Sequence, residues 1–219
     1  MVMALLLSAA WAEATLTFSQ GFAGGAITDG NPVGVVFGGT FTAANPLDQV
    51  LGATVNLTIT GGYNGDLYAY LIAPNGTLVV LMDQPGVGVN GFGAYGSGMN
   101  LTLSDAGSTG IQSETSGSIL SGTYQAAGSL SAMNGSAANG TWTLFFADLA
   151  SGGGQAELTG WTLNLTVVPE PVELALGLFA AMLLALAGLK RVCSPKPAAE
   201  KLNPGGHRLN RRISRPQSR

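Results

Sequence analysis

Charge is scarce in this sequence and unevenly placed. Nine basic and twelve acidic residues stand among 219, about a tenth of the chain where roughly a quarter is usual. All nine Lys and Arg residues lie between Lys190 and Arg219, so the segment before Lys190 carries −11 and the remainder, with its one acid, carries +8. Without basic side chains to neutralise phosphates, residues 1–189 cannot form a nucleic-acid interface.

Cysteine and histidine are almost absent as well. The only cysteine is Cys193 and the only histidine is His207, both in the basic segment. No internal disulfide can form, and residues 1–189 lack the side chains for a Ser/His/Asp or Cys/His catalytic group or for a zinc or copper site. Paired carboxylates remain, but their spacing does not mark a glycosidase site. The sequence therefore predicts a protein that is not an enzyme.

Two apolar segments stand near the ends of the chain. Residues 1–14 open with MVMALLLSAAWA and end in small residues, which predicts a signal peptide without a basic n-region; a first β-strand is the alternative. Residues 172–189 are apolar after Glu173 and would form ~24–27 Å of helix, enough to cross a locally thinned membrane. A buried helix is the alternative here, although such a helix normally has a polar face.

The uneven distribution of charge also predicts a membrane topology. Lys190 and Arg191 end the second apolar run, and the positive-inside rule places the basic side in the cytoplasm. We therefore predict an exported domain over 15–167, a transmembrane helix over 172–189 and a disordered cytoplasmic tail over 192–219. The tail could bind RNA or anionic lipid in principle, but a solvated flank of a membrane span is the commoner role.

Strand patterns fill the exported segment. Apolar and polar side chains alternate with the period of half-buried strands, and no stretch combines helical periodicity with caps. The pair Asn75-Gly76 predicts a hairpin turn, since both residues accept positive φ angles. An all-β fold is expected, an antiparallel sandwich or jelly roll of about eight strands. The residues expected to share a face within each strand are Val55, Leu57 and Ile59; Leu67, Ala69 and Leu71; Trp142, Leu144 and Phe146; and Trp161, Leu163 and Leu165.

Gly-rich segments interrupt the strands. Residues 86–98 and 104–122 are long and lack periodicity, which is typical of functional or disordered loops. Residues 152–154 are three glycines and predict a flexible hairpin loop, because neither the Lys nor the helix of a phosphate-binding loop follows them. Six N-x-[ST] sequons mostly reflect a composition rich in Asn and Thr; they begin at Asn56, Asn75, Asn100, Asn134, Asn139 and Asn164.

Acidic residues at predicted strand ends are candidates for binding calcium. Asp66, Asp105 and Asp148 are placed in this way, and calcium takes carboxylate and carbonyl oxygens. The alternative is that each Asp shapes a turn by bonding a neighbouring backbone amide. A second set of candidates is aromatic, since exposed rings bind carbohydrate, although packing in the core or a loop is the commoner use; these are Tyr63, Phe92 and Tyr95.

The end of the exported segment resembles a sorting signal. Its parts, in order, are Val-Pro-Glu-Pro at 168–171, the apolar helix and the pair at 190–191. This order is similar to the PEP-CTERM signal of exopolysaccharide-producing Gram-negative bacteria. The resemblance implies a signal over 168–191, recognition by an exosortase in the inner membrane, cleavage near Pro-Glu-Pro and delivery to the cell surface or matrix. Its motif residues would be Pro169, Glu170, Pro171, Lys190 and Arg191.

Further motifs span residues 27–166. They are Ile27–Pro32, Tyr63–Leu67, Ala73–Thr77, Gly128–Ser131, Asn139–Leu144 with Asp148, and Gly160–Leu163. Together they resemble the P domain (P/Homo B domain) that follows the catalytic domain in subtilisin-like proprotein convertases. The resemblance implies a galactose-binding-like β jelly roll, which in convertases stabilises the adjacent peptidase.

These expectations favour a non-catalytic protein exported to the cell surface or extracellular matrix, with a structural or adhesive role in an exopolysaccharide matrix. Two alternatives remain open. One is an accessory P domain that supports a separate subtilisin-like serine endopeptidase. The other is a carbohydrate-binding module.

Overall fold

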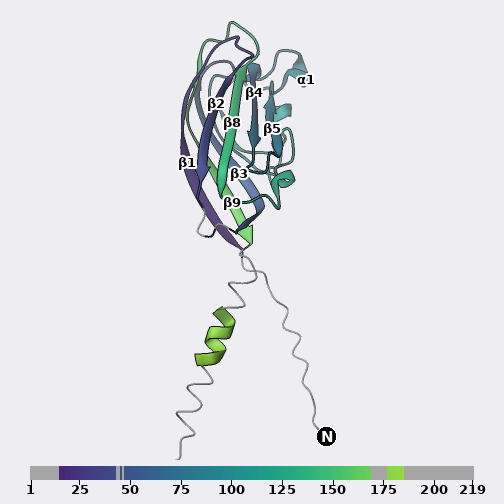
Figure 1. The fold of residues 1–219 in the computed structure, drawn as a ribbon. Coiled ribbons are helices and arrows are strands. Elements are labelled where there is room, and N and C mark those ends of the chain that lie inside the picture. The colour runs from purple at the N-terminus through teal and green to yellow at the C-terminus, as the bar shows by residue number, and fades with distance from the viewer. Residues whose placement is uncertain (1–14, 43–44, 46, 169–176, 185–219) are drawn as a thin grey trace, which may run out of the picture. The chain divides into compact units, whose positions relative to one another are not determined.

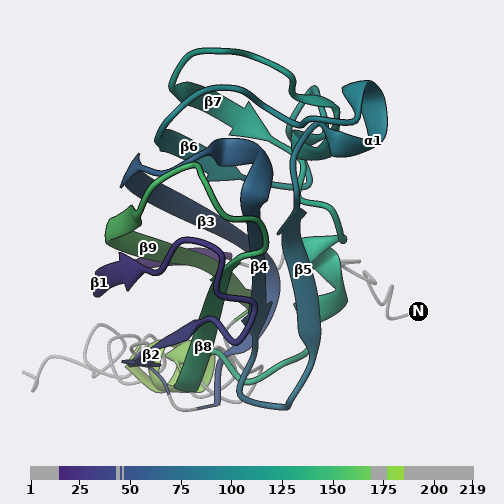
Figure 2. The ribbon, with the colours of Figure 1, turned by 90° about the horizontal axis from the view of Figure 1, so that it is seen from above.

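The computed structural model describes residues 15–42, 45, 47–168 and 177–184, and the chain divides into two units, Met1–Ala175 and Leu176–Arg219. The described part of the first unit is a β-sandwich (Figure 1), and the view along the strands shows its two sheets as two layers (Figure 2). One sheet contains β1 (Leu16–Ile27), β9 (Ala156–Val168), β3 (Gln49–Gly61), β6 (Met99–Leu103) and β7 (Leu120–Tyr124), in that order. The other contains β2 (Val35–Phe41), β8 (Gly140–Asp148), β4 (Leu67–Ile72) and β5 (Leu78–Asp83).

The core lies between the two sheets, and the alternation predicted from the sequence is confirmed. In β3 the side chains of Val55, Leu57 and Ile59 are buried, while the residues between them face outward. The inward sets predicted for β4, β8 and β9 are buried as well. Trp142 is fully buried, and its indole nitrogen donates to the Ala138 carbonyl oxygen at 3.0 Å. Burial of these apolar faces is the main stabilising term of the fold.

The two-sheet β fold is confirmed, with two differences from the expectation. The strand pair β6 and β7 is parallel, so the sandwich is mixed rather than purely antiparallel. β7 also begins at Leu120, inside the segment 104–122 that was expected to be a loop. Its pairing with β6 explains this, since a strand can form from a weak local pattern when a neighbour supplies hydrogen bonds.

The turn at Pro74-Asn75-Gly76 is present but uses one positive φ angle rather than two. Gly76 has φ +86°, whereas Asn75 is not among the described residues with positive φ. The Asn75 side chain instead accepts a hydrogen bond from the Thr77 amide at 3.0 Å. Asn75 therefore shapes the turn through its side chain.

In the second unit only residues 177–184 are described; they are helical and their side chains are exposed. None of the helices in the described part of the chain is both long and apolar enough to cross a membrane. Most of the segment 172–189 lies outside the described residues. The signal peptide at 1–14, the sorting motif (Pro169, Glu170, Pro171, Lys190 and Arg191) and the tail 192–219 lie outside them entirely.

Candidate functional site

A short turn after β3 carries the first elements of the site. This turn is the 3-10 helix η1 (Asn64–Asp66), and its position is held by the segment 86–98. The Asn64 side chain is buried and donates to the Gly98 carbonyl oxygen at 3.0 Å, while its backbone amide donates to the Gly96 carbonyl oxygen at 2.9 Å. These two bonds attach η1 to residues 96–98, while the buried carboxamide oxygen of Asn64 has no hydrogen-bond partner among the described residues.

Within segment 86–98, the Asn90 side chain closes a local turn of the backbone. The segment contains α1 (Val87–Asn90), and the Asn90 carboxamide oxygen accepts from the Phe92 amide at 2.8 Å and from the Gly93 amide at 2.7 Å. The Asn90 amide group donates back to the Gly93 carbonyl oxygen at 3.0 Å. Because these bonds close the backbone on itself, the Phe92 side chain projects outward and is 71% exposed.

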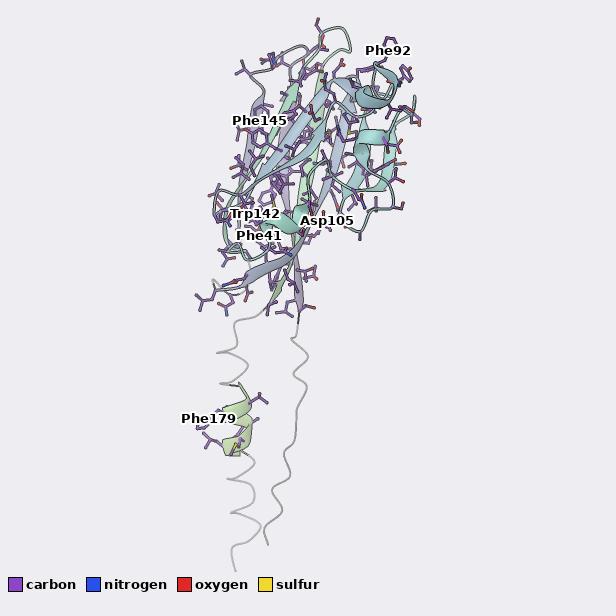
Figure 3. All side chains as sticks on the ribbon, turned by 90° about the vertical axis from the view of Figure 1, so that its right-hand side faces the viewer. Phe41, Phe92, Asp105, Trp142, Phe145 and Phe179 are labelled. Atoms are coloured by element: carbon purple, nitrogen blue, oxygen red, sulfur yellow. The ribbon has the colours of Figure 1, made fainter. Side chains whose placement is uncertain are left out.

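The three aromatic residues proposed from the sequence come together here. The rings of Tyr63 and Tyr95 meet edge to face with their centroids 6.4 Å apart, and the Tyr63 hydroxyl donates to the Phe92 carbonyl oxygen at 3.2 Å. Tyr95 is 52% exposed. Figure 3 places Phe92 at the end of the sandwich distant from Trp142 and Phe41. We call Tyr63, Phe92 and Tyr95 the aromatic cluster.

Carboxylates lie beside the aromatic cluster. Burial raises the pKa of Asp66 to about 6, and the neighbouring charges of Asp148 and Asp29 add to the effect. Burial also raises the pKa of Asp148, against the hydrogen bonds that its Oδ1 accepts from the Gly30 and Ala150 amides, each at 3.3 Å. The buried Oδ2 of Asp148 has no hydrogen-bond partner. We call Asp29, Asp66 and Asp148 the acidic group.

Asp105 does not lie near Asp66 and Asp148. A single calcium site made of all three carboxylates would need them close together. Asp105 instead accepts hydrogen bonds from the Leu130 and Ser131 amides, at 2.8 and 2.7 Å. Figure 3 shows it toward the other end of the sandwich from Phe92. Across the described ranges, no three His, Cys, Asp or Glu side chains are arranged to hold a metal ion. Calcium binding stays a prediction. The amides bound by Asp105 are 25 and 26 residues away in the sequence, so Asp105 joins two distant segments rather than shaping a local turn.

Asp29 is a member of the acidic group that the sequence argument missed. It follows β1, and its carboxylate accepts from the Gly152 amide at 3.2 Å. The prediction of a hairpin at 152–154 is wrong, because this loop connects β8 of one sheet to β9 of the other. The bond to Asp29 attaches the loop to the turn after β1, and a Cβ on Gly153 would lie 2.4 Å from the Cβ of Tyr63. The glycine at 153 therefore permits close approach of this loop to the aromatic cluster.

A second surface crosses the outer face of the other sheet. Val36, Phe145, Tyr70 and Val80 are cross-strand neighbours on β2, β8, β4 and β5. The rings of Tyr70 and Phe145 are stacked with their centroids 4.5 Å apart, and Val36 is 59% exposed. We call these four residues the apolar row. Exposed apolar groups that are contiguous in this way are typical of interaction surfaces.

The family model described as the proprotein convertase P-domain matches residues 50–165, just over half of the chain. The chain belongs to the proprotein convertase P-domain family. Domains of this family are accessory domains and are not catalytic themselves, which agrees with the lack of His and Cys before Lys190. The match covers β3 to most of β9 and therefore includes the aromatic cluster, Asp66 and Asp148.

Two of the solved structures that are similar to this P-domain protein come from Aeromonas sobria. One is the serine protease of Aeromonas sobria in complex with the chaperone ORF2, at 14% identity and a TM-score of 0.44 over 71% of this chain. The other is the same organism's serine protease, at 16% identity and a TM-score of 0.43 over 70% of this chain. In each case this chain covers 27% of the protease chain. None of the curated proteins matches it.

The aromatic cluster and the acidic group determine which ligands the site can bind. Aromatic rings stack against the C–H faces of sugars, and carboxylates accept hydrogen bonds from sugar hydroxyls. Both parts are exposed or half-exposed apart from the buried Asp148. Since no Lys or Arg occurs before Lys190, no positive charge offsets the acidic group within residues 15–168. An anionic ligand is therefore disfavoured at this end of the sandwich.

Proposed function

We propose that this protein is a non-catalytic P-domain module of the cell surface or extracellular matrix that holds exopolysaccharide through its aromatic cluster. The observation that supports the proposal is the convergence of Tyr63, Phe92 and Tyr95 on one exposed surface beside carboxylates. Tyr63 lies 29 residues before Phe92 in the sequence, and it meets Phe92 and Tyr95 where Asn64 and Asn90 help to order the backbone. A structural or adhesive role follows from binding without catalysis.

Titration calorimetry of the protein against exopolysaccharide from its own host tests this function. Phe92→Ala and Tyr95→Ala should each weaken binding about five- to thirtyfold, as expected for loss of stacking worth about 1–2 kcal/mol. Leu47→Ala is the matched control, because Leu47 is 62% exposed and is not part of the aromatic cluster. Equal affinities for all four proteins would show that the aromatic cluster does not bind the polysaccharide.

The route to the surface is the second part of the proposal. The signal peptide at 1–14 would direct export across the inner membrane of a Gram-negative cell, and the segment 172–189 would anchor the precursor. An exosortase would then cleave near Pro169-Glu170-Pro171 and leave Lys190 and Arg191 behind with the helix. Support for this route is the order of the motifs and the placement of all nine basic residues after the apolar run.

Intact-mass spectrometry of the protein from cells with and without exosortase tests the route. We expect a mature form that ends near residue 169 in the first strain and a form that ends at Arg219 in the second. A chain that extends to Arg219 in both strains would contradict sorting and would leave the binding function untouched.

A second candidate function is support of a separately encoded subtilisin-like serine endopeptidase. Family membership and the apolar row favour it, since an apolar surface on the outer face of a sheet can pack against another protein. Adding this protein should then raise the melting temperature of the partner protease, and Tyr70→Ala should remove the effect. An unchanged melting temperature with the wild-type protein would exclude this function.

A further inference from the structure

Three of the six sequons lie together on the outer face of the five-stranded sheet. Each has the sequence Asn-Leu-Thr, and they begin at Asn164 on β9, Asn56 on β3 and Asn100 on β6. These strands are adjacent in the sheet. Because residues two apart share a face of a strand, Asn and Thr of each triplet point outward while the Leu between them is buried. The three triplets therefore place six neutral polar side chains on one face of the sheet.

The register makes amide and hydroxyl groups alternate across this face. Asn56 lies opposite Thr102 on one side and Thr162 on the other, and Thr54 lies opposite Asn164. The Thr102 hydroxyl donates to the Asn56 carboxamide oxygen at 3.1 Å, and the Asn164 amide group donates to the Thr54 hydroxyl at 3.1 Å. Each bond fixes the rotamer of a side chain, so the face is a preorganised set of neutral donors and acceptors.

Two glycines open a hollow in this polar face. Gly21 lies opposite Thr162, and Gly160 lies opposite Thr58, at positions where other strands carry outward side chains. The hollow is a shallow depression, open to solvent, with a volume of about 390 Å³. Its lining residues are Gly21, Asn56, Thr58, Thr159, Gly160 and Thr162, with the stacked pair Phe22 and Trp161.

The fold does not itself require glycine at these two positions. A Cβ on Gly21 would meet nothing closer than 3.7 Å, and a Cβ on Gly160 nothing closer than 3.5 Å. Neither residue has a positive φ angle. Gly24 on the same strand is different, since its Cβ would lie 1.8 Å from the Leu158 carbonyl oxygen. Neither a close contact nor the backbone conformation therefore requires glycine at positions 21 and 160, and the space above both residues is open.

The chemistry of the hollow selects the ligand. Apart from the rings of Phe22 and Trp161, the side chains that line the hollow carry hydroxyl or amide groups, and none is ionisable. Residues 15–168 as a whole contain acids and no bases. A neutral sugar supplies both donors and acceptors, and its C–H face can lie on the bare glycine backbone, whereas a uronate or sulfate would be repelled by the acidic domain. We propose that this hollow is a second carbohydrate subsite, which binds one residue of a neutral polysaccharide. The inference rests on the proposed function for its ligand class but uses different residues.

Amide chemical shifts of the full-length protein test the subsite. Titration with maltoheptaose, a neutral probe, should shift the Gly21, Gly160 and Thr162 amide signals in a saturable way, while oligomannuronate at equal concentration should not. Gly21→Val fills the hollow with a side chain that strands favour, and it should weaken the maltoheptaose response at these signals at least tenfold. Gly38→Val is the control, because a Cβ on Gly38 meets nothing within 4 Å on β2 of the other sheet.

Binding at the aromatic cluster and binding at the hollow can be tested independently. Phe92→Ala should leave the shifts around the hollow unchanged, and Gly21→Val should leave those of Tyr95 unchanged. Absence of saturable shifts at Gly21, Gly160 and Thr162, with shifts at Tyr95 retained, would overturn the subsite and keep the proposed function. The reverse pattern would keep the subsite and overturn binding by the aromatic cluster. An equal response of the hollow to oligomannuronate would overturn the assignment to neutral sugars.

Discussion

The pKa values of Asp66 and Asp105 are shifted in opposite directions in a domain that has no basic residues. Burial and the charges of Asp148 and Asp29 raise the pKa of Asp66 to about 6. Burial acts in the same direction on Asp105, but hydrogen bonds from the Leu130 and Ser131 amides and from two serine hydroxyls outweigh it and lower its pKa. Since no Lys or Arg stands before Lys190, backbone amides and hydroxyls alone stabilise negative charge here.

The raised pKa of Asp66 predicts that the domain loses stability as the pH rises from about 4 to about 6. In that range the folded state holds a proton that the unfolded state, with a pKa near 3.8, has released, so the free energy of unfolding falls with pH. Urea unfolding at several pH values should show this slope, and Asp66→Asn should flatten it. Asp83→Asn, at the end of β5, should keep the slope; equal slopes for wild type and Asp66→Asn would contradict the prediction.

Substitution by Ala should destabilise the domain at Gly34 far more than at Gly38. Gly34 has φ +67°, and a Cβ there would lie 2.3 Å from the Phe145 ring, whereas a Cβ on Gly38 meets nothing within 4 Å. Gly34→Ala should therefore lower the free energy of unfolding by about 2 kcal/mol or more. Gly38→Ala should change it by no more than about 1 kcal/mol. Similar denaturation midpoints for the two variants would show that Gly34 is not held by this contact.

At the scale of elements, the sequence predicted those strands whose own side chains alternate. β3, β4, β8 and β9 carry clear alternation, and their buried faces are the predicted ones. β1 contains five Gly and Ala residues among twelve positions (Gly21, Ala23, Gly24, Gly25 and Ala26), and its strand conformation comes from pairing with β9, some 140 residues away. Such pairing leaves no local signal in the sequence.

The candidate site, too, could be predicted only as far as local sequence patterns reach. Exposure of Phe92 and Tyr95 follows from the Gly-rich context of segment 86–98, and this much could be predicted. Their meeting with Tyr63 depends on hydrogen bonds of Asn64 and Asn90 to backbone atoms, which no spacing rule contains. The contribution of Asp29 depends likewise on how the turn after β1 meets the loop after β8.

The 3-10 helix η3 (Leu130–Met133) depends on Asp105, which lies beyond the end of β6. The Asp105 carboxylate accepts two amide hydrogens at the start of η3, and η3 packs against β3 and β5. Asp105→Ala should cost about 1–2 kcal/mol of unfolding free energy at pH 7, and Asp105→Asn should cost less, since it keeps one acceptor. Because the pKa of Asp105 is lowered in the folded state, its contribution is complete above the unfolded pKa and is lost as the pH falls through the folded one. Thermal unfolding at pH 7 and pH 2 measures this; a penalty for Asp105→Ala that persists undiminished at pH 2 would contradict it.

At the scale of the whole molecule, the position of the basic residues gives a simple assay of processing. Trypsin cuts after Lys and Arg, and the first such residue is Lys190. The unfolded precursor should therefore lose only fragments that follow Lys190, and a mature form cleaved near Pro169 should pass through trypsin unchanged in mass. Loss of mass from the mature form would show that basic residues remain in it and would contradict cleavage before Lys190.

The strand order also determines how the domain carries mechanical load. β9 lies between β1 and β3, and Leu16 at the start of β1 is paired with Val167, so both ends of the sandwich emerge together, opposite α1 (Figure 1). A pull at Val168 against a ligand held at the α1 end acts along the strands. The hydrogen bonds on both sides of β9 are then loaded in shear and must break together rather than one after another. The domain is thus built to resist extension when it is held at Val168 and pulled from its loops.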